Sequence, residues 1–508
     1  MLPLIVGVIV CIIAGLYIYV RWNFGTLEKL GIPVVEHHPL LGSIKEIYGE
    51  PGGLYDTQWM RKYGPVFGVY EGREPQIYVC DADLIRLICV KDADHFNGKR
   101  ILDFGDPLLN EMPDFQPLEK WKLLRQFLTP AFTTAKVKVM SVVMREATAD
   151  YIANIKKTIR ASNKRVYEKI PIDESVHTML TDLITRCCFS IRISANSDAD
   201  NEFAQIVKDV VNPPARTSNM ALLHWSYVFT FLRKFVPAHF NPEAAQKWRK
   251  VFKQMIEERR RSGEKKNDIM DMCVEWMERL DAPKMKEAKF SEMTLICQGL
   301  VFFFAGQDQI STLIATTIYH IATNPEIAKK AYAEVDEVFA KHDGKLEHEH
   351  LTELVYLNAC LSESLRLYPF FHKTERVCTK DWSNEEHGLH IKKGMTVILP
   401  VWAANRNAEY NVDPDTYDPE RWMPENKDKM NPYTSTSFGF GPRSCTGKRF
   451  STEAMPLVTA YMLKELKFVG RKDSELKFTA GGPMFAPHDA IYLDVMERTL
   501  EKVPSQMG

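Results

Sequence analysis

The sequence lacks an excess of charge of either sign. Its 508 residues carry 65 Lys and Arg against 66 Asp and Glu, so it offers no cationic surface of the kind that neutralises nucleic-acid phosphates. Cysteine is also scarce, and ten residues at irregular spacing exclude a disulfide-stapled framework. With 45% hydrophobic and 26% charged residues, the composition is that of a globular protein rather than a disordered or polytopic membrane chain.

Long apolar runs are absent as well, with one exception. Residues 2–20 contain no charged side chain, and a helix of this length spans ~28 Å, close to the ~30 Å hydrocarbon core of a bilayer. A cleaved secretory signal would need a basic start, a shorter apolar stretch and a small-residue cleavage site. Here nothing basic precedes the run, and Tyr17 and Tyr19 lie at its end. We therefore expect residues 1–20 to be an uncleaved transmembrane anchor.

The residues after this run predict its orientation. Arg21 and Lys29 follow it, and the positive-inside rule then leaves the rest of the chain in the cytosol. Pro33 and Pro39 interrupt any continuing helix. Residues 21–44 are therefore expected to be a stiff linker between membrane and globular part, with an ordinary loop as the alternative.

Helical periodicity dominates the remaining sequence, which has no internal repeat or low-complexity tract. Apolar residues recur three and four positions apart in the segments 116–160, 199–212, 243–279, 291–323, 325–340 and 350–368. Alternating β-type runs are fewer, such as 75–80 and 394–400. The pattern predicts a mainly α fold with small β-sheets. The aromatic-rich segment 220–240 fits either core packing or an apolar patch that touches a bilayer or a pocket entrance.

The segment 438–447, FGFGPRSCTG, combines a tight loop with a single cysteine. Gly439, Gly441 and Pro442 favour a turn whose backbone can approach a neighbour closely. Cys445 then stands just before a predicted helix, where the helix dipole and unpaired N–H groups favour a thiolate.

Four roles suit a cysteine in this position. A nucleophile would need a nearby base, but no histidine occurs between His390 and His488. A zinc site would need further Cys or His ligands, and the closest cysteine is Cys378. An axial haem thiolate needs only one protein ligand. A buried structural cysteine is the fourth alternative. The helix that follows the loop is expected over 446–466.

The same segment resembles the haem-binding loop of the cytochrome P450 family. The family pattern F-x-x-G-x-R-x-C-x-G is matched at all five fixed positions: Phe438, Gly441, Arg443, Cys445 and Gly447. Other family signatures occur in the family's order: W-x-x-x-R at Trp121 and Arg125, A-G-x-D at 305–308, E-x-x-R at Glu363 and Arg366, and the segment around Arg421. The resemblance runs from about residue 30 to the C-terminus. Shorter stretches, such as 121–138, resemble animal microsomal members related to the drug-oxidising enzymes of liver.

This resemblance implies a single haem-thiolate catalytic domain over 45–508, with haem b bound through Cys445. It implies that further residues contact the haem or its propionates: Arg100, Trp121, Arg125, Arg376, Phe438, Arg443 and Gly447. Arginine suits propionates because its planar fork binds carboxylates bidentately. Glu363 and Arg366 share a helix face, and with Arg421 they are expected to form a triad that braces the haem loop.

The expected oxygen-binding helix departs from the family at one position. Small Ala305 and Gly306 would let a flat macrocycle lie against the backbone, and Asp308 is retained as an acid. The usual threonine after it is replaced by Gln309, whose amide hydrogen-bonds but does not relay protons as a hydroxyl does. Thr312 lies about one turn further along.

The resemblance predicts a monooxygenase that inserts one oxygen atom from O2 into an apolar small molecule. NADPH-derived electrons would arrive through NADPH-cytochrome P450 reductase, with cytochrome b5 as a second candidate partner, at the endoplasmic reticulum membrane. A haem-thiolate isomerase or dehydratase acting on a lipid peroxide is the alternative, because it needs no proton relay and would tolerate Gln309. A catalytically silent binder of haem or hydrophobic ligands is a third.

Overall fold

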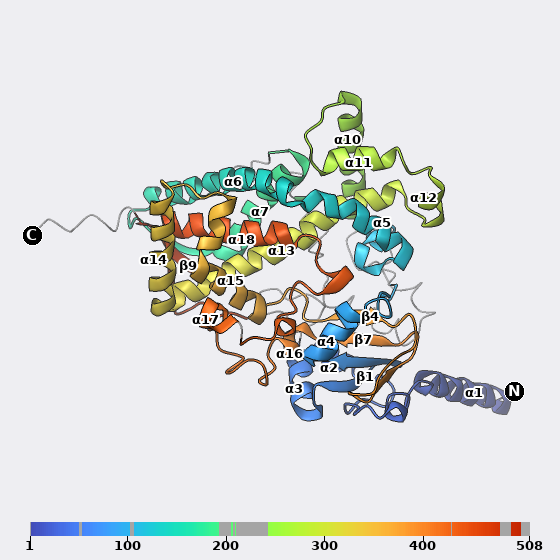
Figure 1. The fold of residues 1–508 in the computed structure, drawn as a ribbon. Helices are drawn as coiled ribbons and strands as arrows, with labels where there is room; N and C mark the ends of the chain where they lie inside the picture. Colours follow the sequence, from blue (N-terminus) through green and yellow to red (C-terminus); the bar gives the residue numbers. More distant parts are fainter. Residues whose placement is uncertain are drawn as a thin grey trace, which may run out of the picture.

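The computed structural model describes residues 2–49, 53–101, 106–192, 205, 206, 209, 242–427, 429–477 and 489–498. Helix α1 (Leu2–Arg21) projects away from the body of the protein (Figure 1). Its apolar side chains are largely exposed, and it is the one described helix that is long and apolar enough to cross a membrane. This geometry agrees with the predicted anchor.

Helix α13 (Glu292–Thr323) runs through the middle of the helical part, as Figure 1 shows. It begins with a capping box, in which the Ser291 hydroxyl accepts from Thr294 N–H and the Thr294 hydroxyl accepts from Ser291 N–H. It ends before Pro325, which cannot continue the α13 hydrogen-bond ladder. Among the helices that pack against it are α7 (Ile172–Phe189), α14 (Pro325–Lys341), α15 (Val355–Leu367) and α18 (Lys448–Glu465). The predicted helices over 291–323, 325–340 and 446–466 are thereby confirmed.

Three predicted helices are each divided in two. Segment 116–160 forms α5 (Leu118–Leu128) and α6 (Thr134–Ala161), because Pro130 starts a 3₁₀ turn, η5 (Thr129–Phe132). Segment 243–279 forms α10 (Pro242–Ser262) and α11 (Ile269–Met277), because Gly263 takes a φ of +65°. Segment 350–368 comprises the 3₁₀ helix η7 (His348–Glu353) and then α15. The predictions for 199–212, in large part, and for 220–240 lie outside the described residues.

Small sheets complete the fold and confirm the predicted class. The largest has the order β1-β2-β7-β4, formed by Val66–Glu71, Glu74–Val79, Thr396–Leu399 and Thr374–Val377. Strand β2 pairs antiparallel with β1 and parallel with β7, which in turn pairs antiparallel with β4. The predicted strands 75–80 and 394–400 are β2 and β7. Strands β3 (Tyr167–Pro171), β9 (Tyr492–Glu497) and β8 (Leu466–Gly470) form a second sheet, and β5 (Trp382–Asn384) and β6 (Leu389–Ile391) a hairpin.

The segment after α1 packs against the largest sheet. Leu27 is fully buried beneath Tyr70, and Val34 pairs with Gly68 of β1. Short elements fill the remaining connections: η1 (Glu28–Leu30), α2 (Ile44–Gly49), α3 (Leu54–Tyr63), α4 (Ala82–Arg86), η2 (Leu87–Lys91), η3 (Leu109–Glu111), η4 (Pro113–Phe115), α12 (Pro283–Glu287), α16 (Val401–Ala404), η8 (Pro419–Trp422), α17 (Pro424–Lys427), η9 (Pro432–Thr434) and η10 (Gly441–Arg443).

Candidate functional site

The cysteine loop needs glycine for two different reasons. Gly439 and Gly441 have φ angles of +65° and +66°, which disfavour any other residue. A Cβ on Gly441 would also lie 1.8 Å from the carbonyl oxygen of Cys89. The loop therefore approaches a neighbouring backbone closely, as its sequence predicts, and that backbone belongs to η2.

Cys445 lies at the point where this loop turns into α18. Its N–H donates to the carbonyl oxygen of Phe438 at 2.8 Å, which closes the loop. The side chain is exposed, yet burial by surrounding protein raises the pKa of its thiol, while the backbone N–H groups of Gly447 and Lys448 lower it. Because the side chain is exposed, a ligand can reach the sulfur. A side chain at Gly447 would come within 4.0 Å of the sulfur.

Two cations flank the cysteine loop. The Arg443 guanidinium lies 3.8 Å over the Trp121 ring and donates to the carbonyl oxygen of Asn97 at 2.6 and 3.2 Å. Its Nη1 is buried without a hydrogen-bond partner among the described residues. Arg125 donates from Nη1 to the Ser444 carbonyl oxygen at 2.6 Å. Trp121, Arg125 and Arg443 thus come together beside the cysteine, as predicted.

Lys99 and Arg376 extend this group of cations. The pKa of Lys99 is lowered to about 8, chiefly by burial; the charges of Arg376 and Arg443 act in the same direction, and those of Asp114 and Glu375 oppose it. Burial also lowers the pKa of Arg443 to about 10, with contributions from Arg376 and Arg125. Asp114 attracts Lys99, Arg125 and Arg443, and Glu375, which also binds Arg100, attracts Lys99. These carboxylates are fewer than the cations around them. Two propionates would reduce this excess of positive charge, and the residues therefore fit the paired propionates of a haem.

Arg100 has carboxylate partners of its own. Its Nε donates to Glu375 at 2.6 Å, and its Nη1 binds Glu71. Because these carboxylates already hold the guanidinium, the geometry favours Lys99 rather than Arg100 for the expected propionate role. Sequence reasoning missed Lys99 because the side chain one position later is an arginine, the residue type that binds propionates bidentately.

Glu363 lies at the centre of the predicted triad and is fully buried. It accepts from Arg366 Nη2 at 2.7 Å and Arg366 Nε at 2.8 Å. Arg421 Nε approaches it to 3.4 Å, as a charge contact rather than a hydrogen bond. The indole N–H of Trp422 and the backbone N–H of Asp418 donate to it as well, each at 2.9 Å. A buried charge with this many partners is a stable arrangement.

Asn405 joins the triad to the cysteine loop, and sequence reasoning missed it. Its carbonyl oxygen accepts from Arg366 at 3.0 Å, and its amide donates to the Arg366 carbonyl oxygen at 3.0 Å. Its Oδ1 accepts from the Thr436 N–H at 3.1 Å, two residues before Phe438. Asn405 follows α16 with no motif around it, so only the fold reveals this contact.

The middle of α13 presents a small residue to open space. Ala305 is exposed, whereas Phe303 and Gln307 on the same helix are buried. Gly306 instead faces α7, since a Cβ there would lie 3.2 Å from Ile184 Cδ1. Asp308 and Gln309 are half-buried.

Asp308 and Thr312 differ in how far they are from solvent. Asp308 Oδ1 lies 2.8 Å from Nε2 of His177 on α7, a partner that no sequence pattern indicates. The side chain of Thr312, one turn further along, is buried. Of the polar side chains singled out on this helix, Asp308 and Gln309 are therefore the accessible ones.

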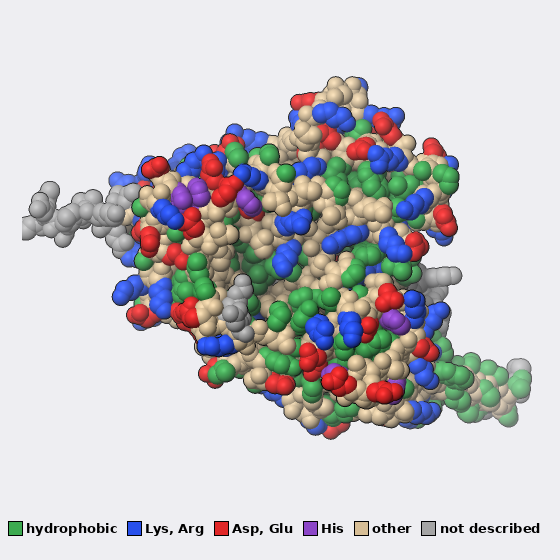
Figure 2. Space-filling view, in the orientation of Figure 1, with side chains coloured by type: hydrophobic (Ala, Val, Ile, Leu, Met, Phe, Trp, Pro, Cys, Tyr) green, Lys and Arg blue, Asp and Glu red, His purple; other side chains and the backbone are tan. Residues whose placement is uncertain are grey.

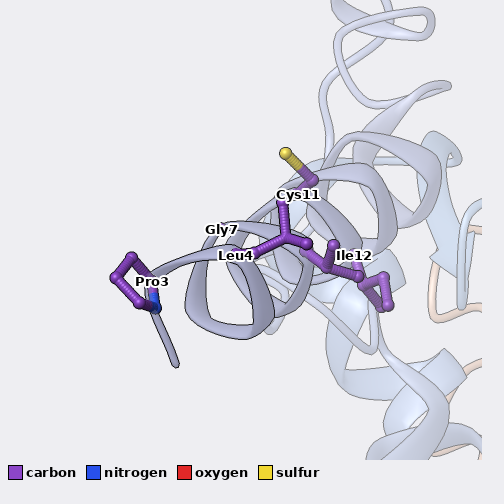
Figure 3. A pocket seen from close by; sticks show the side chains of 6 residues that line it. Pro3, Leu4, Gly7, Cys11 and Ile12 are labelled. Carbon is purple, nitrogen blue, oxygen red and sulfur yellow. The ribbon is translucent and has the colours of Figure 1, made fainter. Parts of the chain in front are cut away.

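A groove on α1 is unrelated to this site. Figure 3 shows it along the first turns of the helix, where Pro3, Leu4 and Cys11 are among the residues that line it. It is open and apolar and is formed by α1 alone. We therefore read it as part of the helix surface that would contact lipid.

The chain matches the Cytochrome P450 family model over residues 32–490. It is 28% identical over 500 residues to Cytochrome P450 3A56 of Fundulus heteroclitus, covering 97% of each chain. It is 28% identical over 485 residues to Cytochrome P450 3A18 of Rattus norvegicus, covering 95% of each. It is 29% identical over 493 residues to Lithocholate 6-beta-hydroxylase of Mesocricetus auratus, covering 95% of this chain and 94% of the relative.

These matches extend over most of the chain, including α5, α13, α15 and the cysteine loop. Members of this family bind haem b through a cysteine thiolate, and its monooxygenases take NADPH-derived electrons through a reductase. The chain is a member of the cytochrome P450 family.

Proposed function

We propose that this protein inserts one oxygen atom from O2 into an apolar small molecule, with Cys445 as the axial haem ligand. The observation that carries the proposal is the accessible Cys445 thiol at the start of α18, in a loop closed onto the η2 backbone. Haem supplies the activation of oxygen, and its thiolate ligand favours cleavage of the O–O bond.

This protein would hold the cofactor in two ways: cationic side chains would bind the propionate carboxylates, and the Cys445 sulfur would bind the iron. Arg125, Arg376 and Arg443 would donate to the propionates, with Lys99 as a fourth cation, and the Trp121 indole stacks on Arg443. Desolvated cations bind carboxylates strongly because few water contacts must be given up. Phe438 and Gly447 shape the loop around the sulfur. The contacts of Glu363, Arg366 and Arg421 hold the segment that leads into it.

Helix α13, which packs against α18, would supply a second wall of the site. The small side chain of Ala305 allows a flat group to approach the helix, and Gly306 allows α7 to pack closely behind it. Asp308 and Gln309 lie one turn further on and are accessible to solvent, so they are the polar groups placed to handle protons there. Because Gln309 replaces a hydroxyl, Asp308 carries more of this task than it would beside a threonine.

A reductase would dock on the face where α18 begins. Lys448 and Arg449 are exposed there, and Figure 2 shows Lys and Arg side chains spread over the middle of this face. Lys120 of α5 is buried against Glu111 and takes no part in such a surface. Lys122 is exposed and paired with Glu119. This basic surface fits an acidic electron donor. NADPH-cytochrome P450 reductase is the expected donor, with cytochrome b5 as a second one.

The proposal places the enzyme at the endoplasmic reticulum membrane. Helix α1 anchors it as a single span, and Arg21 at the end of that span holds the catalytic domain on the cytosolic side. An apolar substrate dissolved in the bilayer is then concentrated next to the enzyme.

The proposal is tested by comparing two supplies of oxygen. Purified protein is incubated with apolar substrates and either reductase plus NADPH under O2 or a lipid hydroperoxide without reductase. We expect an oxygenated product, labelled from ¹⁸O2, only with reductase and NADPH. Rearrangement of the hydroperoxide without any NADPH-dependent product would instead show an isomerase. Inertness under both conditions would show a binder.

A further inference from the structure

His177 connects α7 to the acid of α13. Its Nε2 lies 2.8 Å from Oδ1 of Asp308, and the two side chains are 27% and 18% exposed. The pair joins two helices that are far apart in sequence and pack closely against each other. His177 also lies one turn before Thr181, whose hydroxyl donates to the His177 carbonyl oxygen at 3.1 Å.

Gln307 determines which nitrogen of His177 carries the proton. Its Nε2 donates to the His177 carbonyl oxygen at 3.1 Å and binds the Thr181 hydroxyl, and this fixes the orientation of the amide. The same nitrogen lies 3.2 Å from His177 Nδ1. A hydrogen on Nδ1 would point at this amide nitrogen, which offers no lone pair, so the hydrogen of His177 lies on Nε2. The Nε2–H therefore donates to the Asp308 carboxylate.

This chain of bonds holds one oxygen of Asp308 in a fixed place. A carboxylate that accepts a directed hydrogen bond loses rotational freedom, as do carboxylates and imidazoles paired at other sites. Asp308 needs such a partner because Gln309 occupies the position from which a threonine hydroxyl would act. Gln307 is buried, so it orients the imidazole without reaching the open space itself.

We propose that His177, oriented by Gln307, is a positioning residue that holds the Asp308 carboxylate in place for proton delivery beside Ala305 and Gln309. This inference rests on the proposed function and names one more residue of the same site. His177 acts through Asp308 and need not touch haem or substrate.

The test distinguishes the effect of the hydrogen bond that His177 donates from the effect of the rest of its side chain. His177→Gln places an amide N–H near the position of Nε2, whereas His177→Ala removes the donor. Thr178→Ala is the matched control on α7, since its hydroxyl bonds the backbone of its own helix at Glu174. We expect His177→Ala to lower product formed per NADPH about three- to tenfold with KM little changed. His177→Gln should restore at least half of this ratio, and Thr178→Ala should leave it unchanged.

A second readout does not depend on turnover. Thermal unfolding midpoints are measured for His177→Ala, Asp308→Ala and the double variant, with His177→Phe, which keeps a ring but carries no N–H donor, in place of His177→Ala if the alanine variant does not fold. Because the two residues interact directly, the double variant should lose no more than the larger single loss. Equal product per NADPH in His177→Ala and wild type would overturn the inference, and so would additive midpoint shifts. Absence of NADPH-dependent product in the wild type would overturn the proposed function instead, and the unfolding cycle would still report on the pair.

Discussion

At the residue scale, the cation group beside Cys445 is the feature that most needs an explanation. Lys99, Arg125, Arg376 and Arg443 gather around the loop, and burial opposes the charge of at least two of them. Like charges brought together without counter-ions destabilise a fold. The arrangement is therefore understandable as a site prepared for anionic groups that arrive with the cofactor.

Lys99 should contribute measurably to haem retention. A charge-assisted hydrogen bond stabilises by about 1.5–3 kcal/mol, so Lys99→Met should release haem about tenfold faster or more. The rate is measured by transfer of haem to excess apomyoglobin. Lys122→Met, which removes an exposed lysine, is the control. Equal release rates in Lys99→Met and wild type would show that Lys99 does not bind the propionates.

Gln309 should limit how efficiently oxygen is used. Gln309→Thr restores a hydroxyl next to Asp308, and a hydroxyl can pass a proton on, whereas an amide cannot. We expect product formed per NADPH consumed to rise about two- to fivefold, with a matching fall in hydrogen peroxide. Gln309→Ser should act in the same direction. A ratio that stays constant or falls would mean that Gln309 is not a defect in proton delivery.

At the scale of elements, α15 is anchored by a charge rather than by apolar packing alone. Glu363 accepts from Arg366, Asp418 and Trp422, and Asn405 passes the connection on to Thr436 just before the loop. The cysteine loop is thus held in place from outside, by bonds to segments distant in the sequence.

Glu363→Gln should therefore destabilise the protein strongly. Removing one member of a buried ion pair costs about 3–5 kcal/mol, because Arg366 and Arg421 lose their carboxylate. The variant should unfold at clearly lower urea concentration and yield little holoprotein. Glu420→Gln breaks a more exposed pair with Lys330 and should change stability by less than about 1 kcal/mol. Similar midpoints for both variants would contradict a bracing role for Glu363.

The elements also show what the sequence could predict. The helical spacing of apolar residues and the length of each segment were sufficient to predict α13, α14 and α18. The alternation of apolar and polar residues was sufficient to predict β2 and β7. The helix over 116–160 was predicted too long, because amphipathic periodicity continues across Pro130 while the backbone does not. Contacts such as Asn405 to Thr436 and His177 to Asp308 join segments with no motif in common. Only packing reveals such pairs. Packing also decides whether Lys99 or Arg100 is placed to bind a propionate.

At the scale of the whole molecule, the described structure consists of a packed body and one projecting apolar helix (Figure 1). The exposed side chains of α1 would be costly in water, since each buried CH₂ is worth about 0.8 kcal/mol. A bilayer removes this cost. Membrane attachment therefore follows from the exposure of α1 as well as from its length.

Deleting residues 2–20 should release most of the protein from membranes. The distribution is measured by sedimenting membranes of expressing cells before and after a high-salt wash. Part of the truncated protein is expected to stay bound until that wash if the segment 220–240 touches the bilayer. The shortened protein should still bind haem, because no residue of α1 belongs to the site. Complete retention on membranes after the wash would contradict an anchor function for α1.

The whole account depends on a bond between the Cys445 sulfur and haem iron. The most direct test is the absorption spectrum of the reduced protein under carbon monoxide, for wild type and Cys445→Ser, with haem content measured independently. We expect the red-shifted Soret band of a thiolate-ligated haem in the wild type and its absence in Cys445→Ser. A folded wild-type protein that carries no haem, or a Cys445→Ser variant with an unchanged band, would contradict the account.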